Sequence, residues 1–150
     1  MSRAVLRPAS PSDYPALARI WLQGLALAGE TIESLAERLR REVAHGGWAV
    51  FVAESAGVAV GMLAIIPSQK SLEQIFVEQG LRSRGVGKVM LDFAKTQMPD
   101  GFWLRTHITN TRAHQFYARE GLAHLRDEPH PAYPTELFRI YAWTAVRSDF

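Results

Sequence analysis

The fold of this chain is decided by the stretch Arg82-Ser83-Arg84-Gly85-Val86-Gly87-Lys88, which stands between a strand pattern and a helix pattern. The apolar run at residues 72–77 predicts the strand, and the spacing of apolar residues over 86–95 predicts the helix. Glycines in a strand-to-helix turn let the backbone approach a ligand, and the first N–H groups of the helix can bind an anion. The sequence therefore predicts a phosphate or pyrophosphate site at this turn.

Two common phosphate-binding motifs do not match this turn. A P-loop has glycine where this chain has Arg82, and it has a serine or threonine hydroxyl where this chain has Val89. A dinucleotide fingerprint has a third glycine where this chain has Met90, and it follows the first strand of a βαβ unit. These differences argue against nucleoside triphosphate hydrolysis and against a nicotinamide cofactor.

The pattern R-x-x-G-x-G from Arg82 to Gly87 resembles the pyrophosphate loop of the GNAT acyltransferases, which reads Q/R-x-x-G-x-G/A and cradles coenzyme A. A second stretch, from Asn110 to Leu122, is similar to the family segment N-x-x-A-x-x-F-Y-x-x-x-G-F. The two segments occur in the family's order and spacing, and the resemblance is centred on residues 72–122. Gln79-Gly80 replaces a proline-containing turn and Leu122 replaces phenylalanine, which affects loop geometry and not the fold assignment.

The remaining patterns fit one α/β (α+β) domain over residues 1–150, with a mixed, mainly antiparallel twisted sheet flanked by helices. The expected order is β-α-α-β-β-β-α-β-α-β-β, which is also the GNAT order. The predicted strands cover residues 4–7, 48–54, 58–66, 72–77, 102–106, 122–125 and 138–144. The predicted helices begin at Ser10, Thr31, Val86 and Asn110, and the first of them is expected to reach about Ala28. Three prolines within residues 128–134 predict a semi-rigid loop without ladder hydrogen bonds.

Composition narrows the class of protein further. The chain of 150 residues has no cysteine, which excludes disulfides and thiolate metal sites, and its formal net charge is only +2. No apolar run approaches the roughly 18 residues of a membrane span, and no signal-type segment stands at the N-terminus. The cluster of Arg82, Arg84 and Lys88 around a glycine turn fits a compact polyphosphate better than a nucleic acid. We expect a cytoplasmic protein without a nucleic-acid or membrane partner, and exposed edge strands are compatible with a homodimer.

The resemblance implies a binding site for acetyl-CoA as co-substrate. The pyrophosphate is expected on the backbone N–H groups of the glycine loop, and the pantetheine arm is expected between the strands at 72–77 and 102–106, along main-chain groups. The residues expected to hold coenzyme A are Ile75, Phe76, Val77, Arg82, Arg84, Gly85, Val86, Gly87, Lys88, Asn110, Ala113, Phe116 and Tyr117. The alternative for Gly85 and Gly87 is a tight turn without a ligand.

Acyl transfer also needs an oxyanion site and a proton for the leaving thiolate. Tyr117 follows Asn110 by seven residues, so both lie on nearly the same helix face. The resemblance implies that Tyr117 is the general acid, that Asn110 contacts the pantetheine arm, and that the backbone N–H of Val77 binds the oxyanion. A phenol with a pKa of about 10 is protonated at neutral pH and can donate to a thiolate. The alternative for Tyr117 is a core aromatic beside Phe116.

The general base is left open between Glu73, His107 and a water molecule. Glu73 stands four residues before Val77, so period-2 alternation predicts that both side chains share one face of the sheet. His107 follows the strand at 102–106 and has a side chain that titrates near neutral pH. His130 and Tyr133 in the proline segment either shape the acceptor pocket or belong to a plain surface loop.

The sequence therefore predicts an N-acetyltransferase that moves an acetyl group from acetyl-CoA to a primary amine of a small molecule or peptide. Direct attack of the amine in a ternary complex requires no metal. The alternatives are a catalytically weak acyl-CoA-binding or interaction module and, more distantly, a nucleic-acid-binding protein. The acceptor, the length of the acyl group and the oligomeric state are not encoded in a recognisable motif.

Overall fold

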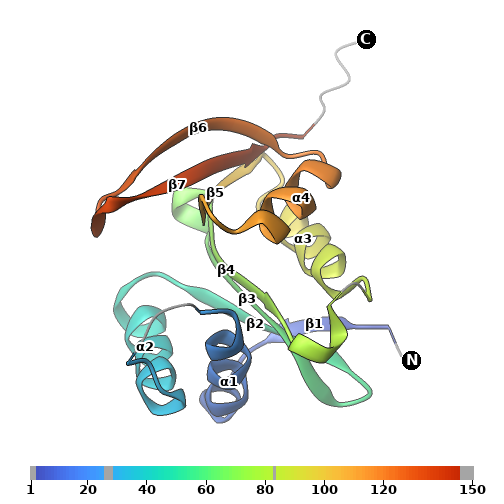
Figure 1. The fold of residues 1–150 in the computed structure, drawn as a ribbon. Helices are drawn as coiled ribbons and strands as arrows, with labels where there is room; N and C mark the ends of the chain where they lie inside the picture. Colours follow the sequence, from blue (N-terminus) through green and yellow to red (C-terminus); the bar gives the residue numbers. More distant parts are fainter. Residues whose placement is uncertain (1–2, 26–28, 83, 146–150) are drawn as a thin grey trace.

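The computed structural model describes residues 3–25, 29–82 and 84–145, which form seven strands and four helices in the predicted order (Figure 1). The strands are β1 (Val5–Pro8), β2 (Ala49–Ser55), β3 (Val58–Ile66), β4 (Ser71–Val77), β5 (Phe102–His107), β6 (Ala123–His130) and β7 (Tyr133–Trp143). The helices are α1 (Tyr14–Gly24), α2 (Ile32–His45), α3 (Val86–Gln97) and α4 (Thr111–Arg119), with 3-10 turns η1 (Pro11–Asp13), η2 (Pro67–Gln69) and η3 (Gln79–Leu81). The mixed α/β class and the order of elements are confirmed.

The sheet has the strand order β1-β2-β3-β4-β5-β7-β6. Its neighbouring strands are antiparallel, apart from β4 and β5, which run parallel and are in register only at Ser71 and Trp103. Next to this pair, the Trp103 N–H donates to the Lys70 carbonyl at 2.9 Å. Beyond it the two strands diverge, and the molecule opens into two halves (Figure 1).

Two hydrophobic cores lie on opposite faces of the sheet. Alternation along β3 sends Met62 into the core under α1 and α2, while Leu63 enters the core under α3 and α4. The first core is built around Trp21 of α1 and Leu39 of α2, both fully buried, and the second includes Met90 of α3. Each helix pair therefore covers one face of the sheet (Figure 1).

The helix starts follow the capping signals of the sequence. Thr31 caps α2, because its hydroxyl accepts a hydrogen bond from the Ser34 N–H at 3.0 Å. At Ser10 the capping box with Asp13 is present, but it opens the 3-10 turn η1, and α1 begins at Tyr14. No helix within the described ranges is both long enough and apolar enough to cross a membrane.

A β-bulge in β4 changes which side chains face each helix pair. Ala64 lies opposite Gln74 and Ile65 lies opposite Leu72, so Glu73 is an extra residue in β4. The Ser71 hydroxyl, on the α1–α2 face of the sheet, donates to Glu73 Oε1 at 3.3 Å, which places Glu73 on that face.

Beyond the bulge, Val77 packs against the core under α3 and α4, and Phe76 packs against the core under α1 and α2. The expectation that Glu73 and Val77 share a face is therefore wrong, because the bulge interrupts the alternation on which it was based.

The proline segment is a hairpin and not a loop. β6 continues to His130 and β7 begins at Tyr133, with Pro129 opposite Leu137 in the ladder. The expected loop over residues 128–134 is therefore wrong. β6 is the edge strand of the sheet and has no neighbour on its outer side. A proline, which lacks an N–H donor, can stand there without the loss of a ladder hydrogen bond on that side.

Helix α1 ends at Gly24, earlier than the expected end near Ala28, which lies outside the described residues. A Cβ atom at Gly24 would overlap the ring of Phe76, which packs directly against the helix. The end of α1 therefore fits closely against β4 where β4 enters the split.

We expect Gly24→Ala to lower the free energy of unfolding by about 1–3 kcal/mol, because the new methyl group must displace the Phe76 ring, a cost larger than the gain in helix propensity. Gly80→Ala is the matched control, since a Cβ there meets open space. Chemical denaturation of both variants measures the difference. Equal stability of the two would contradict this packing.

Candidate active site

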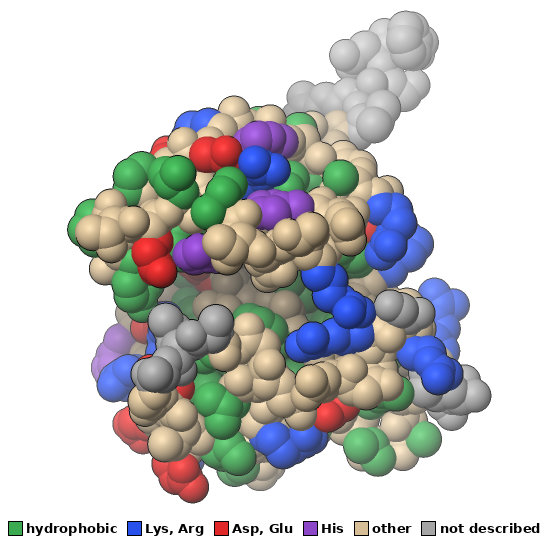
Figure 2. Space-filling model, viewed as in Figure 1, with side chains coloured by type: hydrophobic (Ala, Val, Ile, Leu, Met, Phe, Trp, Pro, Cys, Tyr) green, Lys and Arg blue, Asp and Glu red, His purple; other side chains and the backbone are tan. Residues whose placement is uncertain are grey.

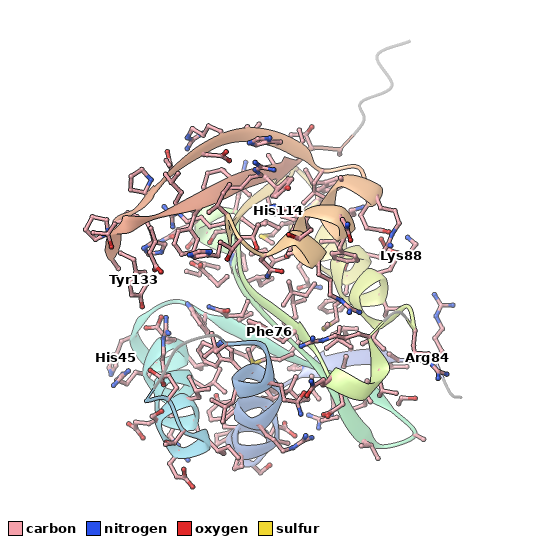
Figure 3. The ribbon with its side chains drawn as sticks, viewed as in Figure 1. His45, Phe76, Arg84, Lys88, His114 and Tyr133 are labelled. Atoms are coloured by element: carbon pink, nitrogen blue, oxygen red, sulfur yellow. The ribbon has the colours of Figure 1, made fainter. Side chains whose placement is uncertain are left out.

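A cleft of about 500 Å³ lies where the sheet splits. Figure 2 shows the molecule hollowed between its two halves, with lysine and arginine side chains gathered toward one end. Phe76 lies at the centre, between the halves, and Lys88 lies on one side (Figure 3). The predicted site residues that line the cleft are Ile75, Phe76, Val77, Arg82, Gly85, Gly87, Lys88, Asn110, Ala113, Phe116 and Tyr117.

The glycine loop ends in an open helix N-terminus. Gly85 has φ of +85°, a conformation that favours glycine, and the first helical bond runs from the Val89 N–H to the Gly85 carbonyl at 3.1 Å. The N–H groups of Val86, Gly87 and Lys88 therefore have no acceptor within the helix. A Cβ at Gly87 would lie 3.4 Å from Cζ of Phe116, so glycine also keeps this side of the cleft open. Such a cradle suits a pyrophosphate.

One loop residue is placed differently from the expectation. The Arg84 N–H donates to the Leu81 carbonyl at 3.3 Å, so it is engaged in the turn and is not directed at a ligand. Arg84 and Val86 line a neighbouring hollow of about 270 Å³ and not the cleft, but the Val86 N–H remains one of the three free N–H groups at the start of α3.

The Lys88 side chain is oriented by two acids. Its ammonium lies 3.1 Å from Asp92 and 3.5 Å from Glu120, and the hydrogen bond to Asp92 raises the pKa of Lys88. Lys88 thus stays charged while its backbone N–H remains part of the cradle.

The open edge of β4 presents main-chain groups to the cleft. The Glu78 N–H donates to the Val60 carbonyl at 2.9 Å, and Val77 lies opposite Gly61. In an antiparallel ladder this arrangement makes Val77 and Gly61 a pair that exchanges no hydrogen bonds, and the same holds two residues earlier at Ile75. The N–H and C=O groups of Ile75 and Val77 therefore point away from β3, toward the space that β5 has left.

Tyr117 is 5% exposed and extends from α4 into the wall of the cleft. Its ring centroid lies 5.3 Å from those of Phe116 and Tyr141. Burial, and secondly the neighbouring Tyr141, raise the pKa of the Tyr117 phenol above its usual value. The hydroxyl therefore stays protonated at any ordinary pH.

Asn110 has a structural task at the start of α4. Its side-chain carbonyl accepts a hydrogen bond from the Ala113 N–H at 3.2 Å, which caps the helix. Because Asn110 also lines the cleft, its amide NH₂ group is left to reach a ligand there.

The candidate bases lie outside the lining of the cleft. Glu73 is half-buried at the bulge, beside Ser71. His107 is engaged at both ring nitrogens, with Nδ1 2.7 Å from the Thr109 hydroxyl and Nε2 3.5 Å from Glu136. His107 is therefore held by its own neighbours, whereas the contact of Glu73 with Ser71 is a long hydrogen bond.

The two residues of the proline segment lie together on the hairpin. The rings of His130 and Tyr133 are 5.2 Å apart, and burial together with the charge of Arg105 lowers the pKa of His130. Tyr133 lies at the rim of the upper half of the molecule (Figure 3).

Sequence reasoning missed two groups of residues that line the cleft. From α4 come Arg112, Gln115 and Arg119, which share a helix face with Phe116. Their spacing of three to four residues was visible in the sequence and would have identified them. Together with Arg82 and Lys88, the two arginines give the cleft the positive charge that a polyphosphate needs.

The other missed group is Gln23 and Gly24, at the end of α1. Gln23 donates to Glu78 at 2.9 Å and accepts from the Gln79 N–H at 2.9 Å, which fixes α1 to the end of β4. These contacts join positions more than fifty residues apart, so no local pattern could have indicated them.

The fold agrees with comparisons to known proteins. Residues 16–122 match the acetyltransferase (GNAT) family, so the chain belongs to this family. No curated protein sequence matches the chain.

Solved structures share the fold at low sequence identity. An acetyltransferase from Thermus thermophilus superposes with a TM-score of 0.79 at 16% identity, covering 95% of this chain and 97% of that one. The yncA structure from Salmonella typhimurium, which contains its cofactor acetyl-CoA, has a TM-score of 0.74 at 15% identity and covers 99% and 98%. A ribosomal-protein-alanine N-acetyltransferase from Brucella melitensis has a TM-score of 0.70 at 20% identity and covers 94% and 99%.

We expect Gly87→Glu to abolish binding of coenzyme A, since a side chain and a negative charge would enter the cradle at the helix N-terminus. Isothermal titration calorimetry with coenzyme A measures the affinity. Gly87→Gln separates the steric effect from the charge, and Gln97→Glu at the far end of α3 controls for an added carboxylate. Retention of micromolar affinity by Gly87→Glu would show that the cradle is not the pyrophosphate site.

Proposed function

We propose that this protein is an N-acetyltransferase that transfers the acetyl group of acetyl-CoA to a primary amine of a small molecule or peptide. The observation that carries the proposal is the open edge of β4, where the main-chain groups of Ile75 and Val77 point into a cleft that ends at the N-terminus of α3. An extended pantetheine arm can hydrogen-bond such an edge as an added strand would. The free N–H groups of α3 then meet the pyrophosphate.

The residues of the cleft supply the groups that acyl transfer needs. The Val77 N–H is aimed into the cleft and would stabilise the oxyanion that develops on the thioester carbonyl. The bond from the amine nitrogen to the carbonyl carbon forms, and the bond from that carbon to sulfur breaks. Tyr117, protonated and buried in the cleft wall, would then give its proton to the leaving sulfur.

Glu73 is the base that we propose for the amine proton, through a water molecule. It lies on the α1–α2 face at the start of the split, and it is held less firmly than His107, whose two ring nitrogens already have partners. A water relay is required by this proposal because Glu73 does not line the cleft itself.

Calorimetric titration of acetyl-CoA, followed by free-thiol detection with a panel of amines, tests the proposed function. Binding in the micromolar range and thiol release with one class of amine are expected. Binding without release by any amine would favour a catalytically weak acyl-CoA-binding module. Absence of binding would refute the assignment of the cleft.

We expect Tyr117→Phe to lower kcat by about 10²-fold with little change in acetyl-CoA affinity, because the substitution keeps the buried ring and removes the proton donor. Tyr14→Phe, which changes a buried tyrosine in the core under α1 and α2, is the matched control. Steady-state kinetics and calorimetry on both variants give the comparison. An unchanged kcat in Tyr117→Phe would exclude the role of general acid.

A further inference from the structure

We propose that the acceptor of this protein carries a carboxylate close to its amine, as an amino acid does, and that Arg105 binds this carboxylate. The inference rests on the proposed N-acetyltransferase function and specifies the class of acceptor. It comes from a cation beside the split that the proposed chemistry does not use.

Arg105 lies on the same face of the sheet as Glu73. Phe102 and Leu104 of β5 enter the core under α3 and α4, so the alternate residues Trp103 and Arg105 face the α1–α2 side. The parallel register of Trp103 with Ser71 places Trp103 level with a residue of that same face. Arg105 therefore projects from β5 on the α1–α2 side of the sheet, just beyond the last point where β4 and β5 are paired.

The guanidinium of Arg105 has no ion-pair partner among the described residues. Its Cζ lies 4.7 Å from the centroid of the Trp103 ring, and its Nε is buried without a hydrogen-bond acceptor in the part of the chain that the structure describes. A buried polar group without a partner costs free energy, so an anion that completes this site would be bound favourably.

The acids near Arg105 already have other partners. Arg105 contributes to lowering the pKa of Glu128, but the larger cause is the hydrogen bond from Arg126, which lies 2.8 Å from Glu128. Glu136 lies 3.5 Å from His107 in the same region. An incoming carboxylate would therefore add the missing partner of Arg105 without having to displace an existing one.

Glu73 and Arg105 stand at corresponding positions on the two diverging strands. Each follows the Ser71 and Trp103 register pair by two residues, and both side chains lie on the α1–α2 face. Because the strands separate at this level, the two opposite charges do not form an ion pair in the described structure. A small molecule with an amine and a carboxylate on neighbouring carbons matches this arrangement, with its amine toward Glu73 and its carboxylate on the planar guanidinium of Arg105.

Thiol release with the twenty amino acids and with their α-carboxamides tests the inference. The carboxamide keeps the amine and the side chain but removes the negative charge. We expect at least one amino acid to be acetylated with a kcat/KM at least about tenfold above that of its carboxamide. Equal kcat/KM values for acid and carboxamide would overturn the role of the carboxylate, and acetylation of carboxylate-free amines alone would do the same while leaving the proposed function standing.

The Arg105→Gln variant assigns the effect to one residue. We expect it to raise KM for the amino acid by about tenfold or more, to leave the carboxamide unchanged, and so to abolish the preference. Arg139→Gln is the matched control, since Arg139 lies opposite Thr106 in the ladder and is paired with Asp127. An equal loss for acid and carboxamide would show that Arg105 has only a structural role.

Two further results separate failure of this inference from failure of the proposed function. Acetyl-CoA affinity, measured on each variant, reports whether the cleft is folded. If Arg105→Gln does not bind acetyl-CoA, Arg105→Lys takes its place. Arg105→Lys keeps the charge but loses the two-pronged contact, so a reduced preference is expected and an unchanged one counts against the proposal. If no amine in a panel that includes polyamines and peptide amines releases thiol, the proposed function fails and this inference fails with it.

Discussion

The divergence of β4 from β5 after the Ser71–Trp103 pair is the constraint on which the rest of the structure depends. A strand inside a sheet normally has its N–H and C=O groups paired on both sides, and leaving them unpaired in a dry interior is costly. Here the second half of β4 has a partner only on the β3 side, so its other edge must face solvent or a ligand. The cleft is therefore a consequence of the sheet topology.

The bulge at Glu73 decides how this open edge is used. Without the extra residue, the side chain of Glu73 and the side chain of Val77 would share a face, and the acid would lie toward α3 and α4. With it, Glu73 lies toward α1 and α2 while the backbone of Val77 still faces the cleft. Along this one strand, the main-chain N–H groups of Ile75 and Val77 thus face the cleft, while the Glu73 carboxylate lies on the α1–α2 face of the sheet. In the proposed reaction this separation keeps the amine site distinct from the thioester site.

The sequence predicted the parts of the site that depend on local chain geometry. Gly85 and Gly87 indicate a turn and a helix N-terminus, and the spacing from Asn110 to Tyr117 indicates a helix face; each lies where it was expected. Other parts depend on long-range contacts, such as those of Gln23 with Glu78 and Gln79, and on pairing across the sheet.

Three residues show why these parts could not be read from the sequence. The bulge at Glu73 is defined only against β3, and Pro129 is tolerated only because β6 has no outer neighbour. Nothing in the sequence marks Arg105, and its missing hydrogen-bond partner is visible only once the strands on both sides are in place. Long-range register is the information that a local pattern does not contain.

The burial of Tyr117 affects both partners of the proposed proton transfer. Burial raises the pKa of the phenol, which taken alone would make it a weaker acid toward a thiolate in water. However, the leaving thiolate would form against the same wall, where the loss of solvent disfavours its negative charge as well. The pKa values of donor and acceptor therefore shift in the same direction, so the pKa difference that opposes the transfer grows by less than the shift of the phenol alone. A buried tyrosine is thus compatible with donation at this position, provided that the proton moves as the carbon–sulfur bond breaks and not after a free thiolate has formed.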